Sequence, residues 1–412
     1  MNAELLSVGT ELLLGEIVNT DAQFLGDELS SLGINVYYQT VVGDNKERLT
    51  NALKMALSRA DIVITSGGLG PTPDDLTKEV IAECMGKKLV FDQSSYDSMA
   101  ERFARVGRHM TENNKKQAML PEGCIILQNH HGTAPGCIIE EHEKVVVMLP
   151  GPPSELTKMY LESVKPYLRR KTDHILYSRV YRMFGVGESA VAQKLAELME
   201  TSQNPTVAPY AKTGEVHLRV TAACKDEQEG ERIVGQVDGA VRKEFDEYIY
   251  STNGNSIAEE SVRLLTENGC TVSAAESCTG GLFAKQITDI PGASSVLGAS
   301  FITYSNAAKT AVLEVSEQTL NEHGAVSPET AREMAEGARK KSGADFGIGI
   351  TGIAGPDGGS DEKPVGLVYV ALADGQDIQV KELRLNGNRD AVRSVTCMHA
   401  FDLLRRKILE KI

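Results

Sequence analysis

Ala275-Glu-Ser-Cys-Thr-Gly-Gly281, Ile302-Thr-Tyr-Ser-Asn-Ala-Ala-Lys309 and Gly349-Ile-Thr-Gly-Ile-Ala-Gly-Pro-Asp-Gly-Gly359 are three turn motifs in the C-terminal part of the chain. Each motif follows a short apolar run, and at least the first two lead into a helical pattern. This alternation predicts an α/β sheet whose strand ends meet at one edge. We therefore expect the polar side chains of the three motifs to gather in one cleft.

The N-terminal part shows the same alternation. β-like runs at Glu4–Val8 and Ile34–Val42 flank a helical pattern at Asp21–Leu32, which is typical of βαβ units. A basic stretch at Arg169–Asp173 and a turn-forming stretch at Ser251–Ser256 indicate two boundaries. The sequence predicts an α/β, multidomain protein with α/β domains at 1–168 and 254–412 and a small α+β connecting domain at 169–253.

Composition limits the class of protein. The 412 residues carry a formal net charge of −14, which disfavours nucleic acid as a partner. No apolar run approaches the length of a membrane span, and the N-terminus has no basic leader. The seven cysteines are scattered without a C-x-x-C pair, which fits a reducing compartment and gives no zinc signature. We expect a cytoplasmic protein that does not bind membranes.

The first C-terminal motif carries a candidate catalytic hydroxyl, Ser277. The following Thr279, Gly280 and Gly281 are candidates for substrate binding, because glycines let N–H groups converge and a helix N-terminus favours an anion. The alternative is a tight turn with a capping hydroxyl. Cys278 is a second candidate nucleophile, since a thiol at a helix N-terminus can have a lowered pKa.

The second motif carries Tyr304 and Lys309. If Asn306 caps the following helix, Lys309 lies in its first turn, where the helix dipole disfavours a cation. A nearby cleft is then expected to lower the pKa of Lys309, as a catalytic base requires. The alternative is an ordinary surface lysine.

The third motif opens with Thr351. Its Gly352 and Gly355 allow a ligand to approach the backbone closely, although a flexible loop is an equal alternative. Arg389, four residues before Arg393, suits a phosphate, whereas such pairs more often form surface salt bridges. A hydroxyl, an amine base and helix-terminal N–H donors are parts that amide hydrolysis can use.

A fourth motif, Ser66-Gly-Gly-Leu-Gly-Pro-Thr-Pro-Asp-Asp-Leu-Thr77, lies between a strand and a helix in the N-terminal part. Its candidates for a phosphate cradle are Ser66, Gly67, Gly68 and Gly70. Asp74 and Asp75 offer the hard oxygen ligands that Mg²⁺ or Mn²⁺ prefers. The alternative is that Asp75 only caps the following helix.

The C-terminal motifs, together with Asn388-Arg-Asp-Ala-Val-Arg393, resemble the nicotinamide-nucleotide amidohydrolase domain of the CinA (competence/damage-inducible) family. The resemblance covers about residues 255–412. It implies hydrolysis of the carboxamide of nicotinamide mononucleotide to nicotinate mononucleotide and ammonia, with no cofactor. It also implies that Ser277 is the key hydroxyl and Lys309 its base, while Tyr304, Thr351 and Arg389 assist and bind substrate. Whether Ser277 attacks the amide or only positions water stays open.

The N-terminal segment, about residues 1–168, resembles the molybdopterin-binding fold as it occurs in full-length CinA proteins. That resemblance implies a metal-dependent ADP-ribose pyrophosphatase, with Asp74 and Asp75 as candidate metal ligands for Mg²⁺ or Mn²⁺. Two alternatives are a non-catalytic accessory protein in competence or DNA damage and a molybdopterin-binding protein. Related domains often form dimers, so a homodimer is expected.

Overall fold

The structure of the protein is a computed structural model that describes residues 1–410. The chain divides into two compact units. The first comprises Met1–Ser178 and Thr221–Ile233, and the second comprises Arg179–Val220 and the residues from Val234 onward. Among the described helices, none is both long enough and apolar enough to cross a bilayer.

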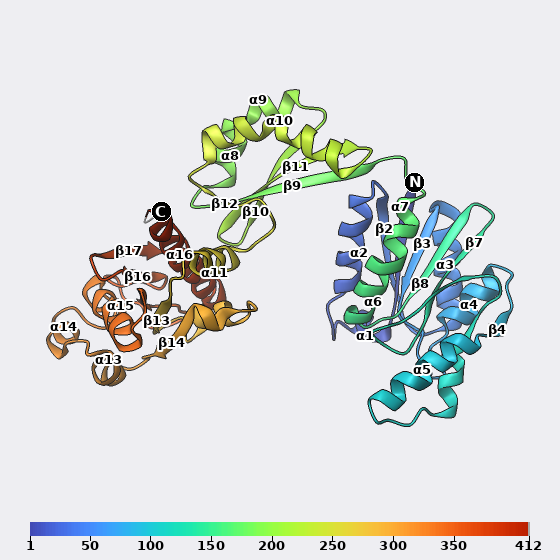
Figure 1. Cartoon of the computed structure of the whole chain (residues 1–412), viewed down its shortest axis with the longest axis horizontal. Helices are drawn as coiled ribbons and strands as arrows, with labels where there is room; N and C mark the ends of the chain where they lie inside the picture. The colour runs from blue at the N-terminus through green and yellow to red at the C-terminus, as the bar shows by residue number, and fades with distance from the viewer. Residues whose placement is uncertain (411–412) are drawn as a thin grey trace. The chain divides into compact units, whose positions relative to one another are not determined.

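The first unit is built on a six-stranded sheet of order β2-β1-β3-β8-β7-β6 (Figure 1). Its strands are β1 (Asn2–Val8), β2 (Asn35–Val42), β3 (Ile62–Ser66), β6 (Ile125–Leu127), β7 (Gly136–Glu141) and β8 (Lys144–Leu149). The first three strands of the chain and β8 pair in parallel, whereas β7 and β6 add an antiparallel edge. The carboxyl ends of β1, β3 and β8 therefore lie at the same edge of the sheet.

Helices and short connecting elements complete this unit. They are α1 (Thr10–Leu14), α2 (Thr20–Ser31), α3 (Lys46–Arg59), α4 (Thr77–Cys84), α5 (Gln93–Arg105), a 3₁₀ helix (Glu112–Ala118), α6 (Pro153–Met159), a π-helical turn (Tyr160–Val164), α7 (Lys165–Arg169) and the hairpin of β4 (Leu89–Phe91) with β5 (Met119–Pro121). Asn19 and Asn45 cap α2 and α3 by accepting backbone N–H bonds, as their sequence positions favour.

The middle of the chain forms a four-stranded sheet of order β10-β11-β9-β12. Its elements are β9 (Ile175–Phe184), α8 (Glu188–Lys194), α9 (Ala196–Thr201), β10 (Thr206–Lys212), β11 (Glu215–Cys224), α10 (Glu227–Phe245) and β12 (Ile249–Ser251). This α+β composition is the one that the sequence predicts for the connecting domain.

The C-terminal part is a five-stranded sheet of order β14-β13-β15-β16-β17. Its strands are β13 (Val272–Glu276), β14 (Leu297–Ile302), β15 (Phe346–Gly352), β16 (Leu367–Ala373) and β17 (Ile378–Arg384). The helices are α11 (Ile257–Glu267), α12 (Leu282–Thr288), α13 (Asn306–Leu313), α14 (Glu317–Glu322), α15 (Pro328–Ser342) and α16 (Arg389–Glu410), with a 3₁₀ turn at Ala293–Ser295. Because β13 pairs in parallel with both β14 and β15, the carboxyl ends of these three strands meet.

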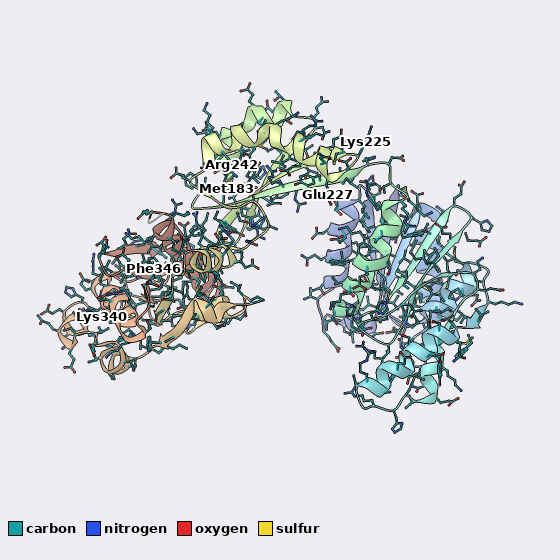
Figure 2. All side chains as sticks on the ribbon, viewed as in Figure 1. Met183, Lys225, Glu227, Arg242, Lys340 and Phe346 are labelled. Atoms are coloured by element: carbon teal, nitrogen blue, oxygen red, sulfur yellow. The ribbon has the colours of Figure 1, made fainter. Side chains whose placement is uncertain are left out.

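Alternation along β15 decides which helix covers each face of this sheet. Phe346, Ile348 and Ile350 share a core with residues of α11, α12 and α16. The intervening Gly347 and Gly349 face α15, where a Cβ atom would lie 2.1 Å from Ala335 O and 2.3 Å from Ala331 O respectively. Figure 2 shows Phe346 inside the domain, while the exposed Lys340 of α15 extends outward. Because both residues are glycines, α15 can approach the sheet closely.

The predicted α/β, multidomain fold is confirmed. A strand at Gly366–Ala373, corresponding to β16, is predicted by the sequence, but the antiparallel pairing of β6, β7, β16 and β17 is not. The exact domain bounds stay predictions.

Candidate active sites

The turn Ser277–Gly281 of the C-terminal domain follows β13 directly. Its anchor is Glu276, a completely buried carboxylate at the end of that strand. Glu276 accepts N–H bonds from Gly281 (3.0 Å), Phe283 (3.2 Å) and Ala284 (3.0 Å), which lie at the start of α12. The anion at this helix N-terminus is thus the Glu276 side chain. The sequence predicts instead that a substrate anion binds there, at Thr279, Gly280 and Gly281. The N–H of Gly281 is already bonded, and that of Gly280 donates to Ser277 O.

Lys309 lies beside the half-buried Ser277. Its Nζ is 3.2 Å from Ser277 Oγ, 2.8 Å from Thr303 O and 3.4 Å from Tyr304 O. The lysine side chain is 1% exposed, and this burial lowers its pKa below 10.5, in the predicted direction. Ser305, not the predicted Asn306, caps α13. Lys309 nonetheless lies in the first turn of that helix, and it is not a surface lysine.

Arg389 joins two of the predicted motifs. Its guanidinium donates to Gly355 O at 2.7 Å and lies 3.4 Å from the hydroxyl of Tyr304, which is 64% exposed. Arg393 of α16 donates to Thr279 O at 2.7 Å and so links that helix to the turn Ser277–Gly281. Arg389 is itself exposed, so its guanidinium is accessible to an anion.

Three further candidates have structural surroundings of other kinds. The Thr351 hydroxyl is buried and donates to Ala325 O at 2.6 Å, so in this structure it supports the backbone between α14 and α15. Gly352 approaches β16, where a Cβ would lie 2.7 Å from Leu367 O. Cys278 is 6% exposed, and burial raises the pKa of its thiol to about 11, which opposes a thiolate nucleophile.

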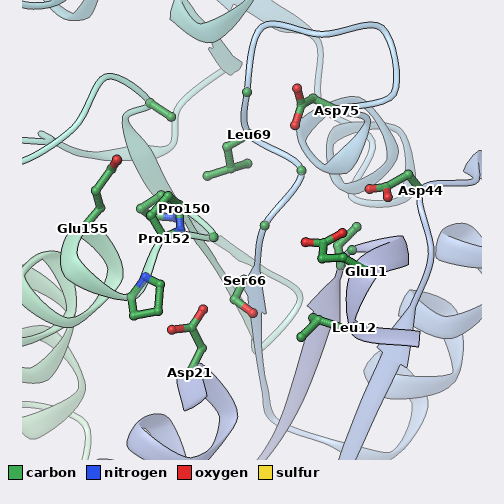
Figure 3. Close-up of a pocket in the computed structure, with 18 of the residues that line it drawn as sticks. Glu11, Leu12, Asp21, Asp44, Ser66, Leu69, Asp75, Pro150, Pro152 and Glu155 are labelled. Carbon is green, nitrogen blue, oxygen red and sulfur yellow. The ribbon is translucent and has the colours of Figure 1, made fainter. Parts of the chain in front are cut away.

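The first unit holds a cavity of about 570 Å³ at the carboxyl edge of its parallel strands. Figure 3 shows its walls: the loop after β1, the glycine-rich loop after β3 and the proline-rich turn after β8. Six acidic residues line it, and no Lys, Arg or His occurs among its described lining residues. The acidic residues are Glu11, Asp21, Asp44, Asp74, Asp75 and Glu155.

The predicted phosphate cradle lines this cavity with all four of its residues, Ser66, Gly67, Gly68 and Gly70. Part of its glycine content has a structural cause. Gly67 and Gly68 have φ of +94° and +68°, and a Cβ on Gly67 would lie 2.2 Å from Val8 O. The Gly67 N–H donates to Leu149 O, so it is not free for a phosphate.

Asp74 and Asp75 also line the cavity. Asp75 does not cap α4, whose N-cap is Leu76 without a side-chain bond; it accepts from the N–H and hydroxyl of Thr72. Among residues 1–410 no group of three or more His, Cys, Asp and Glu is arranged to hold a metal ion. Mg²⁺ commonly takes one or two carboxylates and completes its shell with water and phosphate oxygens, so this pair fits a metal that a phosphorylated substrate helps to hold.

The whole length of the chain is similar to known proteins. Residues 4–170 match the family described as "Probable molybdopterin binding domain", residues 178–251 match "Damage-inducible protein CinA KH domain", and residues 254–408 match "CinA C-terminal domain". A competence-damage inducible protein of Acetivibrio thermocellus is 49% identical over 410 residues, which cover 100% of this chain and 99% of the relative.

The chain belongs to the CinA family. A CinA-like protein of Kosmotoga olearia is 49% identical over 409 residues and 99% of both chains. Among solved structures, the competence/damage inducible protein CihA of Agrobacterium tumefaciens is 44% identical, covers 36% of this chain and 91% of its own, and gives a TM-score of 0.35.

Two buried charged groups of this CinA-family protein were not singled out as site residues from its sequence, although the stretch Asn19–Asp21 was expected to supply polar groups to the N-terminal site. Asp21 is 8% exposed and lines the N-terminal cavity. Lys78 is 2% exposed and donates to Lys116 O (3.0 Å) and Gln117 O (2.7 Å), and its burial lowers its pKa to about 8. A polar residue within an apolar helical face is the only sequence signal for either, and that signal does not separate buried from exposed positions.

Proposed function

We propose that the C-terminal domain hydrolyses the carboxamide of nicotinamide mononucleotide, giving nicotinate mononucleotide and ammonia. The observation that carries the proposal is the 3.2 Å contact between Lys309 Nζ and Ser277 Oγ at the meeting point of three parallel strands. A hydroxyl beside a buried amine is the arrangement of an activated serine nucleophile.

The surroundings of Lys309 favour the neutral amine. A neutral amine has two N–H bonds and one lone pair, and the carbonyls of Thr303 and Tyr304 accept two hydrogens. The lone pair is then left for the Ser277 hydroxyl. No carboxylate is bonded to Lys309 among the contacts of the described residues, so no opposite charge compensates for the burial that lowers its pKa.

In the proposed reaction the Ser277 hydroxyl gives its proton to Lys309 while its oxygen attacks the carboxamide carbon. The intermediate collapses by breaking the C–N bond, and Lys309 returns the proton to the departing ammonia. Lys309 then takes a proton from water, which hydrolyses the acyl-serine ester and regenerates Ser277. The exposed guanidinium of Arg389 is placed to bind the phosphate of the substrate.

The pH dependence of this activity follows from Lys309. Because burial lowers its pKa, the amine is deprotonated at a lower pH than an ordinary lysine. We expect kcat/KM to rise with pH along a limb whose midpoint lies below 10.5. Rates of ammonia release between about pH 6 and pH 10 measure the limb. A flat profile, or one that rises only above 10.5, would contradict a neutral Lys309 as the base.

A second activity is proposed for the N-terminal cavity: metal-dependent cleavage of ADP-ribose to AMP and ribose 5-phosphate. The acidic wall without a basic residue supports it, because such a wall repels a bare diphosphate and accepts one that carries a divalent cation. Asp74 and Asp75 would hold the metal, which supplies charge neutralisation at the phosphates.

Removal of divalent metal ions by a chelator distinguishes the two proposed activities in one sample. We expect EDTA to abolish ADP-ribose cleavage and Mg²⁺ or Mn²⁺ to restore it, because the acidic wall has no other way to neutralise the diphosphate. Ammonia release from nicotinamide mononucleotide should continue unchanged and serves as the control for intact protein. Cleavage that survives EDTA would refute the metal requirement, and a chain that binds a pterin but cleaves neither nucleotide would refute both proposed activities.

A further inference from the structure

Asp21 has an unusual position for a carboxylate. It lies in the first turn of α2, is 8% exposed and lines the N-terminal cavity, and its Oδ1 atom has no hydrogen-bond partner among the described residues. The polar groups beside it are already engaged: Asn19 accepts from the Ala22 N–H and donates to the Ser7 hydroxyl. Asp21 is therefore a carboxylate in the wall of the cavity, and one of its buried oxygens is left without a hydrogen bond.

An open buried carboxylate is costly for the folded protein. Burial raises the pKa of Asp21 from 3.8 to about 6, so at neutral pH the group is ionised in a poorly solvated place. Between these two values the folded protein holds a proton that the unfolded chain has lost, and stability falls as the pH rises. Positions that weaken the fold in this way are commonly functional ones.

The residues around Asp21 indicate which kind of ligand group could bind its unbonded oxygen. It belongs to no group of three or more metal-ligating side chains in the described part of the chain, which disfavours a protein-held metal at this point. One open acceptor oxygen suits one hydrogen bond from a neutral donor. The Ser66 hydroxyl lines the same cavity, and so do the apolar Leu12, Pro150 and Pro152 (Figure 3), which suit the uncharged part of a nucleotide.

We propose that Asp21 binds a ribose hydroxyl, so that the N-terminal cavity selects ribosylated diphosphates whose sugar hydroxyls are free. Recognition of a ribose hydroxyl by an acidic side chain is a common solution in nucleotide-binding α/β folds. The inference rests on the proposed N-terminal activity and names the part of the substrate that determines selection. Asp21 acts as a binding residue, while the metal at Asp74 and Asp75 acts on the phosphates.

Titration calorimetry with the full chain tests the proposal, with Ca²⁺ added to hold the diphosphate. The ligands are ADP-ribose and two analogues, each lacking the 2′-hydroxyl of one ribose. We expect Asp21→Asn to weaken ADP-ribose binding at least about ten-fold. One analogue should bind the wild type more weakly than ADP-ribose does, by a similar factor. Asp21→Asn should bind that analogue and ADP-ribose equally well, because the deleted hydroxyl and the deleted carboxylate belong to one contact. Asp27→Asn, an exposed position of the same helix, is the matched control and should bind normally.

The outcomes separate the inference from the activity on which it rests. Wild-type cleavage of ADP-ribose with unchanged binding to Asp21→Asn, or equal analogue losses in both proteins, overturns the role of Asp21 alone. Failure of the wild type to bind ADP-ribose overturns both. Folding is checked by ammonia release and by thermal unfolding, where Asp21→Asn should raise Tm at neutral pH and raise it less at pH 4. Asp21→Ala supplies a second variant with the same expected loss of binding.

Discussion

Ser277→Ala and Lys309→Met are each expected to reduce ammonia release from nicotinamide mononucleotide by at least about 1,000-fold, because each removes one half of the proposed catalytic pair. Their combined variant should be scarcely worse than either single variant, since residues that act as a unit do not contribute additively. Initial rates without added metal, at a pH where the wild type is fully active, provide the measurement.

Cys278→Ser is the matched control for this pair. It changes the residue next to Ser277, whose thiol is buried and has a pKa raised to about 11. We expect it to keep activity within about three-fold of the wild type, since a buried thiol of this kind is not a nucleophile. Loss of activity in Cys278→Ser with retention in Ser277→Ala would make the thiol the nucleophile. Full activity of Lys309→Met would remove the lysine from the mechanism.

Glu276→Ala is expected to have the largest effect on the stability of the C-terminal domain. The substitution leaves three N–H groups at the start of α12 without their carboxylate, inside the protein. Hydrogen bonds to a charged group contribute about 1.5–3 kcal/mol each, and because the three share one carboxylate we expect a total loss of about 3–5 kcal/mol. The turn that holds Ser277 should move, so kcat should fall more than substrate affinity.

Thermal unfolding of the full chain, followed together with ammonia release, measures both effects. Because a multidomain chain need not unfold in one step, the shift is read from the transition that accompanies loss of amidohydrolase activity. Glu259→Gln is the control: this exposed glutamate belongs to the capping box of α11 and accepts the Ser256 N–H at 2.7 Å. It should cost about 1 kcal/mol or less. Equal losses in Glu276→Ala and Glu259→Gln would show that burial of Glu276 is unimportant.

The pairing of Ser277 with Lys309 could be predicted because it depends on local rules. Apolar runs identified the strands, parallel strands bring their carboxyl ends together, and Lys309 follows shortly after the end of β14, on the next helix. The fold class followed from the same alternation. The direction of the pKa shift of Lys309 also followed, although its main cause is burial, which the sequence does not display.

Other roles depend on which groups meet after folding. Glu276 lies inside the first C-terminal motif, yet a glutamate at a strand end gives no sign that it will accept three N–H bonds from the following helix. Thr351 ends its strand as predicted, but its hydroxyl is used by Ala325, which lies far away in the sequence. Asp75 bonds to Thr72 in its own loop and leaves the helix uncapped. Burial of Asp21 depends on the walls of a cavity that three separate loops form.

The absence of side chains at Gly347 and Gly349 has a consequence for how this domain can change over evolutionary time. Each position touches a backbone oxygen of α15, and a backbone, unlike a side chain, cannot be exchanged for a smaller one. A larger residue at either position could therefore be accommodated only if the whole helix moved, together with the strand end that reaches the active-site edge. Variation in homologous proteins should accordingly accumulate on the outer side of α15 and leave its inner side fixed.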